Sequence, residues 1–369
     1  MQKVTCETVS PVHIGSGLNL QRQIEFLAEG NEIALVDDKK VLSTIGSENI
    51  DKWVHIIERR EKLLEYLKTR KPGLTLNDVA RRILRINGSI GNIQYLREQL
   101  HNGMGLAMIP GSSLKGAIRT ALLNNWLKQH TRLWGKDKLG FYKKGKFEFQ
   151  DNKVVEACFG KDPNHDLLRF LQIGDLHFQG NTEALVVDTM NYTGRGITYK
   201  DSVRQLIEVI PADSVAEAGM QIRKAHLRKN LENGWIRNEP DYLKNMQSLF
   251  SGVNRHTIEM LQKEMEFWEE DRGESIVDGY LNTLESLHEK AASLDENSCL
   301  VRLGFGSGWT FMTGAWIKDE ELVKDEIYND ILNQARPGNR KYRDMFFPKT
   351  RKMHRDFHLL GFVQLSMAT

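Results

Sequence analysis

Two long, highly charged segments with helical periodicity interrupt a chain that otherwise alternates between strand-like stretches and glycine-containing turns. In WVHIIERREKLLEYLK, residues 53–68, the apolar side chains fall near one face of a helix and the charges lie opposite. A second such segment runs from Ser214 to about Ser293, whereas residues 2–9 alternate apolar and polar side chains as a strand does. Strand-rich portions that are each interrupted by helices favour an α+β fold.

The same pattern occurs in both halves of the 369 residues, which suggests a duplicated unit. We predict two ferredoxin-like (RRM-like) domains, residues 1–187 and 188–369. The first domain carries a helical insertion at about 47–100, in which LNDVARRILRI is predicted to be a second helix. The second domain carries an acidic helical insertion at about 214–295.

The composition indicates in which cellular compartment the protein is expected. No apolar run approaches the ~20 residues of a membrane helix, and the first residues contain no apolar signal-peptide core. The three cysteines, Cys6, Cys158 and Cys299, lie far apart and form no CxxC pair, which is typical of the reducing cytosol. We therefore expect a cytoplasmic protein without membrane contact.

The formal net charge is only +2, but the charges are unevenly distributed. Residues 336–355 contain eight basic residues and one acid, whereas residues 259–296 contain twelve acids and three bases. This asymmetry predicts a basic region for an anionic partner and an acidic region that faces solvent or a protein neighbour.

The stretch IPGSSLKGAIRT, residues 109–120, resembles a phosphate-binding P-loop in the spacing of Gly111 and Gly116. A Walker A loop also needs a lysine and a hydroxyl residue after the second glycine, to hold the terminal phosphates and magnesium. Ala117 and Ile118 stand there instead, so we expect neither nucleotide hydrolysis nor a nucleotide cofactor.

The same stretch still contains the parts of an anion site at the start of a helix. Ser112 or Ser113 can cap the helix after Gly111, and Lys115 and Arg119 lie one turn apart on one face. Free amides, the helix dipole and two cations together suit a phosphodiester backbone. The alternative is a capped helix with two solvated bases.

The cluster RLGFGSGW is a second candidate for contact with a sugar-phosphate chain. Alternating glycines let a ligand approach the backbone amides, and an aromatic side chain can stack on a base. The alternative is a glycine-rich bend with core aromatics. The candidate RNA-binding residues of this cluster are Arg302, Gly304, Gly306, Ser307, Gly308 and Trp309.

The third candidate is PVHIGSG, in which His13 follows the first strand and Gly15, Ser16 and Gly17 form a turn. His13 can act as a general acid or base, donate a hydrogen bond to a phosphate, or only pack. Catalysis is the least favoured of the three, because the sequence shows no catalytic partner for this histidine.

Basic residues interleaved with aromatic ones occur in FFPKTRK, residues 346–352. Lys349, Arg351 and Lys352 suit RNA, although a solvated basic loop is the ordinary alternative. His354 and His358 follow, four residues apart, but they lack the glutamate of a zinc-binding helix. We therefore expect no metal site, and no arrangement of residues predicts a catalytic centre.

Several of these motifs, taken together, resemble the RAMP superfamily of CRISPR proteins: PVHIGSG, IPGSSLKGAIRTALL, CFG with FLQIGDLHF, RLGFGSGW, and FPKTRK with LLGFVQL. The resemblance runs from residue 11 to residue 365. PGSSLKGAIR is shared by many RAMP proteins, whereas its combination with RLGFGSGW and FPKTRK is similar to the fifth-subunit family of the type III-A Csm interference complex. FLQIGDLHF has Ile-Gly where Val-Ser is expected, so we assign no RNA role to Asp175.

The resemblance implies two ferredoxin-like domains in a subunit that caps the 3′ side of the guide crRNA at the head of the complex. It implies a role in complex assembly and crRNA 3′-end maturation in antiviral defence, without nuclease activity of its own. The implied partners are crRNA, nearby target RNA, the backbone RAMP subunits and host nucleases that trim the crRNA. Because few groups are available to read bases, we expect binding that is largely independent of RNA sequence.

Two alternatives stay open. The first is a metal-independent crRNA-processing endoribonuclease of the same superfamily, with His13 as general acid or base. The second is a scaffold protein whose glycine turns serve only protein contacts.

Overall fold

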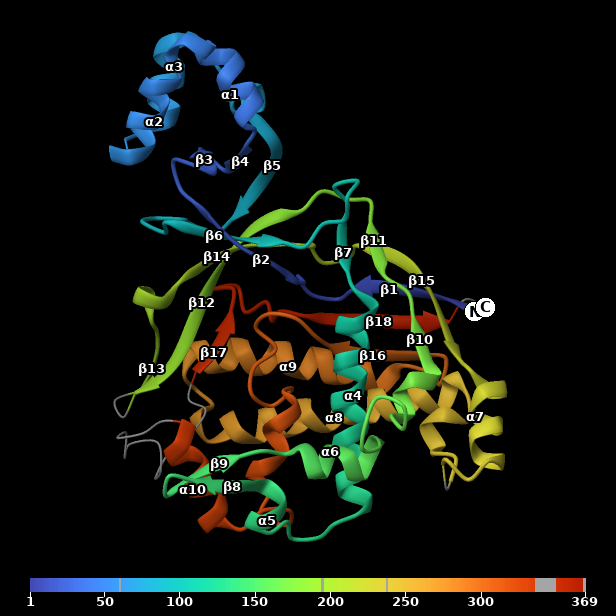
Figure 1. Ribbon diagram of the computed structural model, residues 1–369. Helices are drawn as coiled ribbons and strands as arrows, with labels where there is room; N and C mark the ends of the chain where they lie inside the picture. Colours follow the sequence, from blue (N-terminus) through green and yellow to red (C-terminus); the bar gives the residue numbers. More distant parts are fainter. Residues whose placement is uncertain (60, 194–195, 237, 336–349, 368–369) are drawn as a thin grey trace.

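The computed structural model describes residues 1–59, 61–193, 196–236, 238–335 and 350–367. A five-stranded sheet occupies its centre, in the order β10–β15–β1–β18–β16 (Figure 1). The strands are β1 (Gln2–Thr8), β10 (Leu171–Ile173), β15 (Val215–Ile222), β16 (Ser298–Arg302) and β18 (Phe362–Met367). The antiparallel pair β1 and β18 places Cys6 opposite Leu365, so this sheet joins the two ends of the chain.

Helices cover one face of this sheet, as Figure 1 shows for α4 (Gly111–Gln129), α8 (Met246–Trp268) and α9 (Ser275–Ser293). Two side chains of α8 fix the packing. The side chain of Asn254 donates to the carbonyl of Ala291 in α9 (2.8 Å) and accepts from the amide of Leu300 in β16 (3.0 Å), while the Thr257 hydroxyl donates to the Leu300 carbonyl (2.6 Å). These buried polar groups are satisfied, so they tie the helices to the sheet without a desolvation penalty.

A second, larger sheet has the order β2–β6–β14–β12–β5–β4–β3, and β13 and β17 also pair with β12. Its strands are β2 (Gly15–Gln21), β3 (Phe26–Glu29), β4 (Glu32–Val36), β5 (Ala80–Asn87), β6 (Tyr95–Gln99), β12 (Glu183–Thr193), β13 (Gly196–Tyr199), β14 (Gln205–Val209) and β17 (Thr350–Met353). Both large sheets therefore combine strands from the two sides of residue 187. The division into two domains at that point stays a prediction.

The other elements surround the two sheets. Helices α1 (Asp38–Ile45), α2 (Ile50–Arg59) and α3 (Leu63–Arg70) form a small lobe beside β3 and β4, at the top of Figure 1. Elsewhere lie β7 (Ala107–Ile109) with β11 (Leu176–Phe178), the hairpin β8 (Gly140–Lys143) and β9 (Lys146–Phe149), and the helices α5 (Lys136–Leu139), α6 (Asn152–Phe159), α7 (Lys224–Glu232) and α10 (Asp325–Ala335). The fold is α+β, as predicted. Among the helices that the structure describes, none is long and apolar enough to cross a membrane.

The predicted helical insertion at about 47–100 is wrong in its second half. LNDVARRILRI forms a short 3₁₀ turn at Leu76–Asp78 and then strand β5, and β6 ends at Gln99. In β5, Leu84 is buried and Arg85 is exposed, which is strand alternation rather than a helical stripe. An apolar pattern this short fits both the helical and the strand period. Pairing with β4 and β12 makes this segment a strand.

The acidic helical insertion also begins later than predicted, because Val215–Ile222 is strand β15 and helix starts only at Lys224. Most acids of residues 259–296 lie on the surface or are half-buried, as expected for a region facing solvent or a protein neighbour. Glu264 is the exception, since its side chain is only 3% exposed. Its partner is Arg351, one of the predicted RNA-binding residues.

One buried histidine of α8 makes stability dependent on pH. His256 is 4% exposed and packs edge-to-face against Phe311 (6.4 Å between ring centroids). Burial, followed by the positive charges of Lys128 and Lys263, lowers the pKa of His256 to about 3. Below about pH 6.5, His256 is therefore protonated in the unfolded chain but stays neutral in the folded chain. The free energy of unfolding falls as the pH drops below that value.

We expect His256→Leu to remove this acid sensitivity. Between about pH 7.5 and pH 5.5 the free energy of unfolding should fall by about 1.4 kcal/mol less in the variant than in the wild type. Urea denaturation at the two pH values measures the difference. His55→Leu, on the exposed face of α2, is the matched control and should keep the wild-type pH dependence. An unchanged pH dependence in His256→Leu would contradict the assignment.

Candidate nucleic-acid interface

The two glycine segments that are distant in the sequence lie against each other. The amide of Phe305 donates to the carbonyl of His13 (3.0 Å), so PVHIGSG and RLGFGSGW share a main-chain hydrogen bond. Gly304 has φ +78°, and a Cβ there would stand 2.6 Å from the same carbonyl oxygen. Only glycine fits such a backbone approach. The structure therefore joins these two predicted elements at one place.

His13 is buried at this junction, with 2% of its surface exposed. Its Nδ1 lies 2.6 Å from the main-chain carbonyl oxygen of Glu208 in β14, so this nitrogen donates a proton and the ring holds loop and strand together. Burial, opposed by that hydrogen bond, lowers the pKa of His13. A neutral, enclosed imidazole is poorly placed as a general acid or base for RNA, and the geometry supports a packing role.

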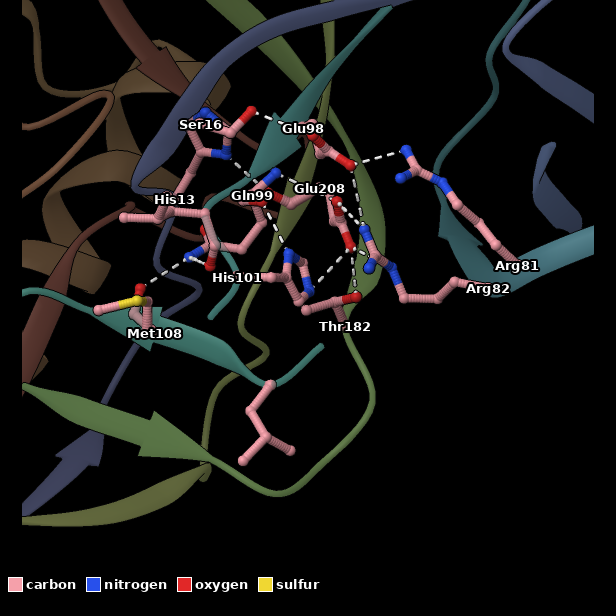
Figure 2. Close-up of polar contacts among 12 residues, drawn as sticks. His13, Ser16, Arg81, Arg82, Glu98, Gln99, His101, Met108, Thr182 and Glu208 are labelled. Atoms are coloured by element: carbon pink, nitrogen blue, oxygen red, sulfur yellow. Dashed lines mark hydrogen bonds and ion pairs between the residues drawn. The ribbon is translucent and has the colours of Figure 1, made fainter. Parts of the chain in front are cut away.

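A buried carboxylate lies beside His13, in the network drawn in Figure 2. Glu208 is 0% exposed, and its carboxylate accepts hydrogen bonds from the Thr182 hydroxyl (2.6 Å), the Gln99 amide (3.1 Å) and the Arg82 guanidinium (3.1 Å). Arg82 belongs to β5, Gln99 to β6, and Thr182 immediately precedes β12. The network therefore locks the strands that surround the glycine junction. This network could not be predicted from the sequence, because the segment that forms β5 is predicted to be helical.

Ser16 takes part in the same network. Its hydroxyl donates to the carboxylate of Glu98 (3.1 Å), which also accepts from Arg81 (2.8 Å). Ser16 thus points to the protein side of β2. Between Gly15 and Asn19 the pairing of β2 with β6 shifts in register, so strict alternation does not hold there, and Asn19 is paired with Arg97 of β6.

Two cations approach the ring of Phe305 at the open side of the junction. The guanidinium carbon of Arg97 lies 5.0 Å from the ring centroid and the ammonium of Lys352 lies 4.1 Å from it. Partial burial, followed by the positive charge of Arg97, lowers the pKa of Lys352. Arg97 forms no ion pair with any residue that the structure describes. Two cations at one ring, of which Arg97 disfavours the charge of Lys352, favour the binding of an anion beside them.

A hollow of about 780 Å³ adjoins these cations, and we call it the Arg97 groove. Its walls come from the start of β6 and β14 and from the loops before them, and Tyr95 offers an exposed aromatic ring. Lys352 reaches the wall by donating to the side chain of Gln205 (3.1 Å). The polar and charged residues that line the groove include Asn19, Arg97, Asp201, Arg204 and Gln205.

The two neighbouring basic residues of β17 lie on opposite faces of the strand, because successive side chains in a strand point to opposite sides. Lys352 lies on the groove side, whereas Arg351 is 6% exposed and forms an ion pair with Glu264 of α8. Burial alone would raise the pKa of Glu264, but the charge of Arg351 and hydrogen bonds from Arg351, Tyr280 and Thr310 lower it to about 2. Arg351 therefore leaves the candidate interface.

Arg302 is also buried, and burial lowers its pKa to about 10. Its guanidinium donates to the carbonyl of Leu360 (3.0 Å) and to that of Gly306 (3.1 Å). It thus braces the glycine loop from the inside and offers no face to a phosphate. Trp309 packs against the central core, while Gly306, Ser307 and Gly308 stay partly exposed on the loop. Lys349 lies outside the described residues.

The start of helix α4 does not hold a free anion site. The amide of Gly111 donates to the carboxylate of Asp175 (2.7 Å), so a carboxylate of the chain itself occupies this end of the helix. A Cβ on Gly111 would stand 2.2 Å from the carbonyl oxygen of Ile173, which explains the glycine. Pro110 is the N-cap residue and makes no side-chain capping hydrogen bond, so neither Ser112 nor Ser113 stands at the predicted capping position.

The two cations of α4 are engaged within the protein as well. Lys115 donates to the carbonyl of Leu171 (2.8 Å), and Arg119 forms an ion pair with Asp166 (2.7 Å) while lying over the ring of Phe159. Both therefore serve to hold the segment 159–171 against the helix. Removing these two side chains would test packing rather than RNA binding.

The structure thus brings together only part of the predicted set. His13, Gly15, Gly17, Gly304 and Lys352 lie around one junction, and Arg97 and Tyr95 are additions that the sequence did not reveal. The available signal was the aromatic residue two positions before a basic one in YLR. It was overlooked because the segment to Gln99 was predicted to be helical.

The motifs and fold identify the class of protein. Residues 5–311 match the model of the RAMP superfamily, and the chain belongs to this family. Within it, the chain is similar to Csm5, the CRISPR system Cms protein Csm5, of Methanocaldococcus jannaschii (26% identity) and of Streptococcus thermophilus (23% identity). These matches cover 52% and 60% of this chain, but only 46% and 66% of the relatives' own length.

Solved structures share the fold over nearly the whole chain. The crystal structure of T. onnurineus Csm5 superposes with a TM-score of 0.66 at 19% identity, covering 97% of this chain and 99% of that one. A chain in the cryo-EM structure of a Csm–crRNA–target RNA ternary complex of a type III-A CRISPR-Cas system gives a TM-score of 0.68 at 18% identity, covering 99% and 100%. The chain is thus a Csm5-like RAMP protein.

Proposed function

We propose that this chain is a crRNA-binding subunit of a type III-A Csm complex, with two ferredoxin-like domains. It caps the 3′ side of the crRNA, contacts the backbone RAMP subunits close to the target RNA, and supports assembly and 3′-end maturation. Host nucleases rather than this chain remove the RNA end. Its relatives are named as Csm5, and a Csm complex with crRNA and target RNA contains a chain of the same fold.

The observation that carries the proposal is the pair Arg97 and Lys352 beside the glycine junction. Their charges are only 5.0 and 4.1 Å from one ring, and the strand next to them carries glycines at 15 and 17. A phosphate can approach such a backbone closely while both cations neutralise it. Tyr95 can stack on any base. This combination holds RNA without reading its sequence, as a guide with a variable spacer requires.

The double variant Arg97→Ala/Lys352→Ala tests the interface. If each cation meets one phosphate, the affinity for a short labelled single-stranded RNA should drop by about tenfold or more. The slope of log affinity against log salt should fall by about 1.4, that is about 0.7 for each contact. Fluorescence anisotropy of the purified full-length chain between about 50 and 200 mM salt measures both quantities.

The matched control removes two positive charges elsewhere. Lys39→Ala/Lys52→Ala changes exposed lysines of α1 and α2 and lowers the net charge equally. It should leave the salt slope close to that of the wild type. An equal loss in the two double variants would show a general charge effect and reject the Arg97 groove as the interface, whatever the protein's role in the complex.

A further inference from the structure

A tight turn after β17 gathers two histidines and an aspartate. His354, Asp356 and His358 each offer one ligand atom, and these three atoms all lie within 4.8 Å of one another. The imidazole rings of His354 and His358 are stacked at 5.8 Å between centroids. The prediction of no metal site rested on the missing glutamate of a zinc-binding helix, but the segment is a turn closed by a hydrogen bond from the His354 amide to the His358 carbonyl (3.1 Å).

The turn is held in an uncommon backbone conformation. Phe357 has φ +62°, in the left-handed region that non-glycine residues seldom adopt. Its ring lies against Gly279 of α9, where a Cβ would stand 2.3 Å from the ring. The Phe357 ring therefore fills the space that a side chain at position 279 would occupy, and this packing fixes the turn. Such strain persists only where the surroundings impose it, and it orients the side chains on both sides of Phe357.

Two electron-rich atoms face each other in this turn. The backbone amide of Asp356 lies 3.2 Å from Nδ1 of His354, and because an amide can only donate, this nitrogen carries a lone pair. A carboxylate oxygen of Asp356 lies 3.4 Å from the same Nδ1. The Asp356 carboxylate therefore lies close to the edge of the His354 ring.

The neighbouring arginine does not occupy the space between the three side chains. Arg355 points elsewhere, to Asp188 (3.3 Å) and Asp201 (2.9 Å). Asp356 and His358 are exposed, which gives an ion access from solvent.

From this geometry we infer that His354, Asp356 and His358 form a binding site for a first-row divalent metal ion such as Zn²⁺. Two imidazoles and one carboxylate are the ligands that Zn²⁺ takes, whereas Mg²⁺ and Ca²⁺ prefer oxygen alone. Three protein ligands leave one position of a tetrahedral ion open to solvent. The site is separate from the Arg97 groove and does not depend on the proposed RNA role.

Titration of the full-length, EDTA-treated and tag-free chain with ZnCl₂ in a calorimeter tests the inference. We expect one site in the wild type, and dissociation constants raised at least about tenfold in His358→Ala and in Asp356→Asn. Co²⁺ should give visible d–d absorption with the wild type that both variants lose. Because both side chains are exposed, the variants should keep the wild-type thermal midpoint in EDTA, and Zn²⁺ should raise that midpoint only in the wild type.

His55→Ala, which removes an exposed histidine of α2, is the matched control and should bind Zn²⁺ as the wild type does. The inference is overturned if the wild type binds no Zn²⁺, or if His358→Ala and Asp356→Asn bind it as tightly as the control. Equal binding of MgCl₂ and ZnCl₂ would also overturn it, since that result indicates carboxylate attraction alone.

Discussion

Arg351→Ala is expected to destabilise the protein by about 3–5 kcal/mol, because it leaves a buried carboxylate without its cation. Arg351 and Glu264 have side-chain exposures of 7% and 3%, and a second contact joins Nη2 to Oε2 at 3.1 Å. Tyr280 and Thr310 also donate to Glu264, at 2.7 and 2.8 Å, but neither supplies charge. Urea denaturation of the full-length chain measures the loss.

The neighbouring residue provides the control. Lys352→Ala should change the free energy of unfolding far less, by about 1 kcal/mol or less, since the side chain of Lys352 lies on the groove face. It should weaken RNA binding instead. The double variant Glu264→Leu/Arg351→Met should lose less stability than the sum of the two single changes, because both charges leave together. Equal destabilisation by Arg351→Ala and Lys352→Ala would refute the assignment of the two faces.

Gly111→Ala and Gly116→Ala are expected to change stability in opposite directions, although the two glycines give the motif its P-loop spacing. A Cβ at 111 would meet the carbonyl oxygens of Ile173 and Gly174 at 2.2 and 2.9 Å, and backbone atoms cannot move aside. We expect a loss of about 1–3 kcal/mol or more, as for other overpacked sites. The shift would also disturb the hydrogen bond from the Gly111 amide to Asp175.

At Gly116 a Cβ meets nothing within 4 Å, and the residue lies exposed inside α4. Alanine is a better helix former than glycine, so Gly116→Ala should stabilise the protein by about 0.5–1 kcal/mol. Denaturation curves of the two variants under one condition measure the contrast. A destabilised Gly116→Ala, or an unaffected Gly111→Ala, would contradict the packing at this end of the helix.

The α+β class, the helix after Pro110 and the glycine turns could be predicted because each leaves a local pattern. Residues 76–86 could not be assigned, since ARRILRI satisfies strand and helix periods equally and its pairing partners, β4 and β12, are distant. Arg97 was missed for the same reason. A helical pattern up to residue 100 does not place Arg97 beside Phe305, which lies more than two hundred residues away in the chain.

The basic residues show the same limit most clearly. The sequence indicated that Lys115, Arg119, Arg302, Arg351 and Lys352 were candidates for an anion, and it could not rank them. In the structure Arg119 and Arg351 form ion pairs with carboxylates, and Lys115 and Arg302 donate to backbone carbonyls. Lys352 lies beside the open groove. Whether a cation is free depends on what the fold brings next to it.

The sequence by itself determined the family, the mixed class of the fold and the glycine positions, because motifs and backbone requirements are local properties. Only the tertiary structure decided which glycine turns meet, which cations stay available and that His354, Asp356 and His358 converge. Those outcomes depend on strand pairing and burial between residues far apart in the chain. A buried charge must find a partner or lose its charge, and the fold alone determines which residues are buried.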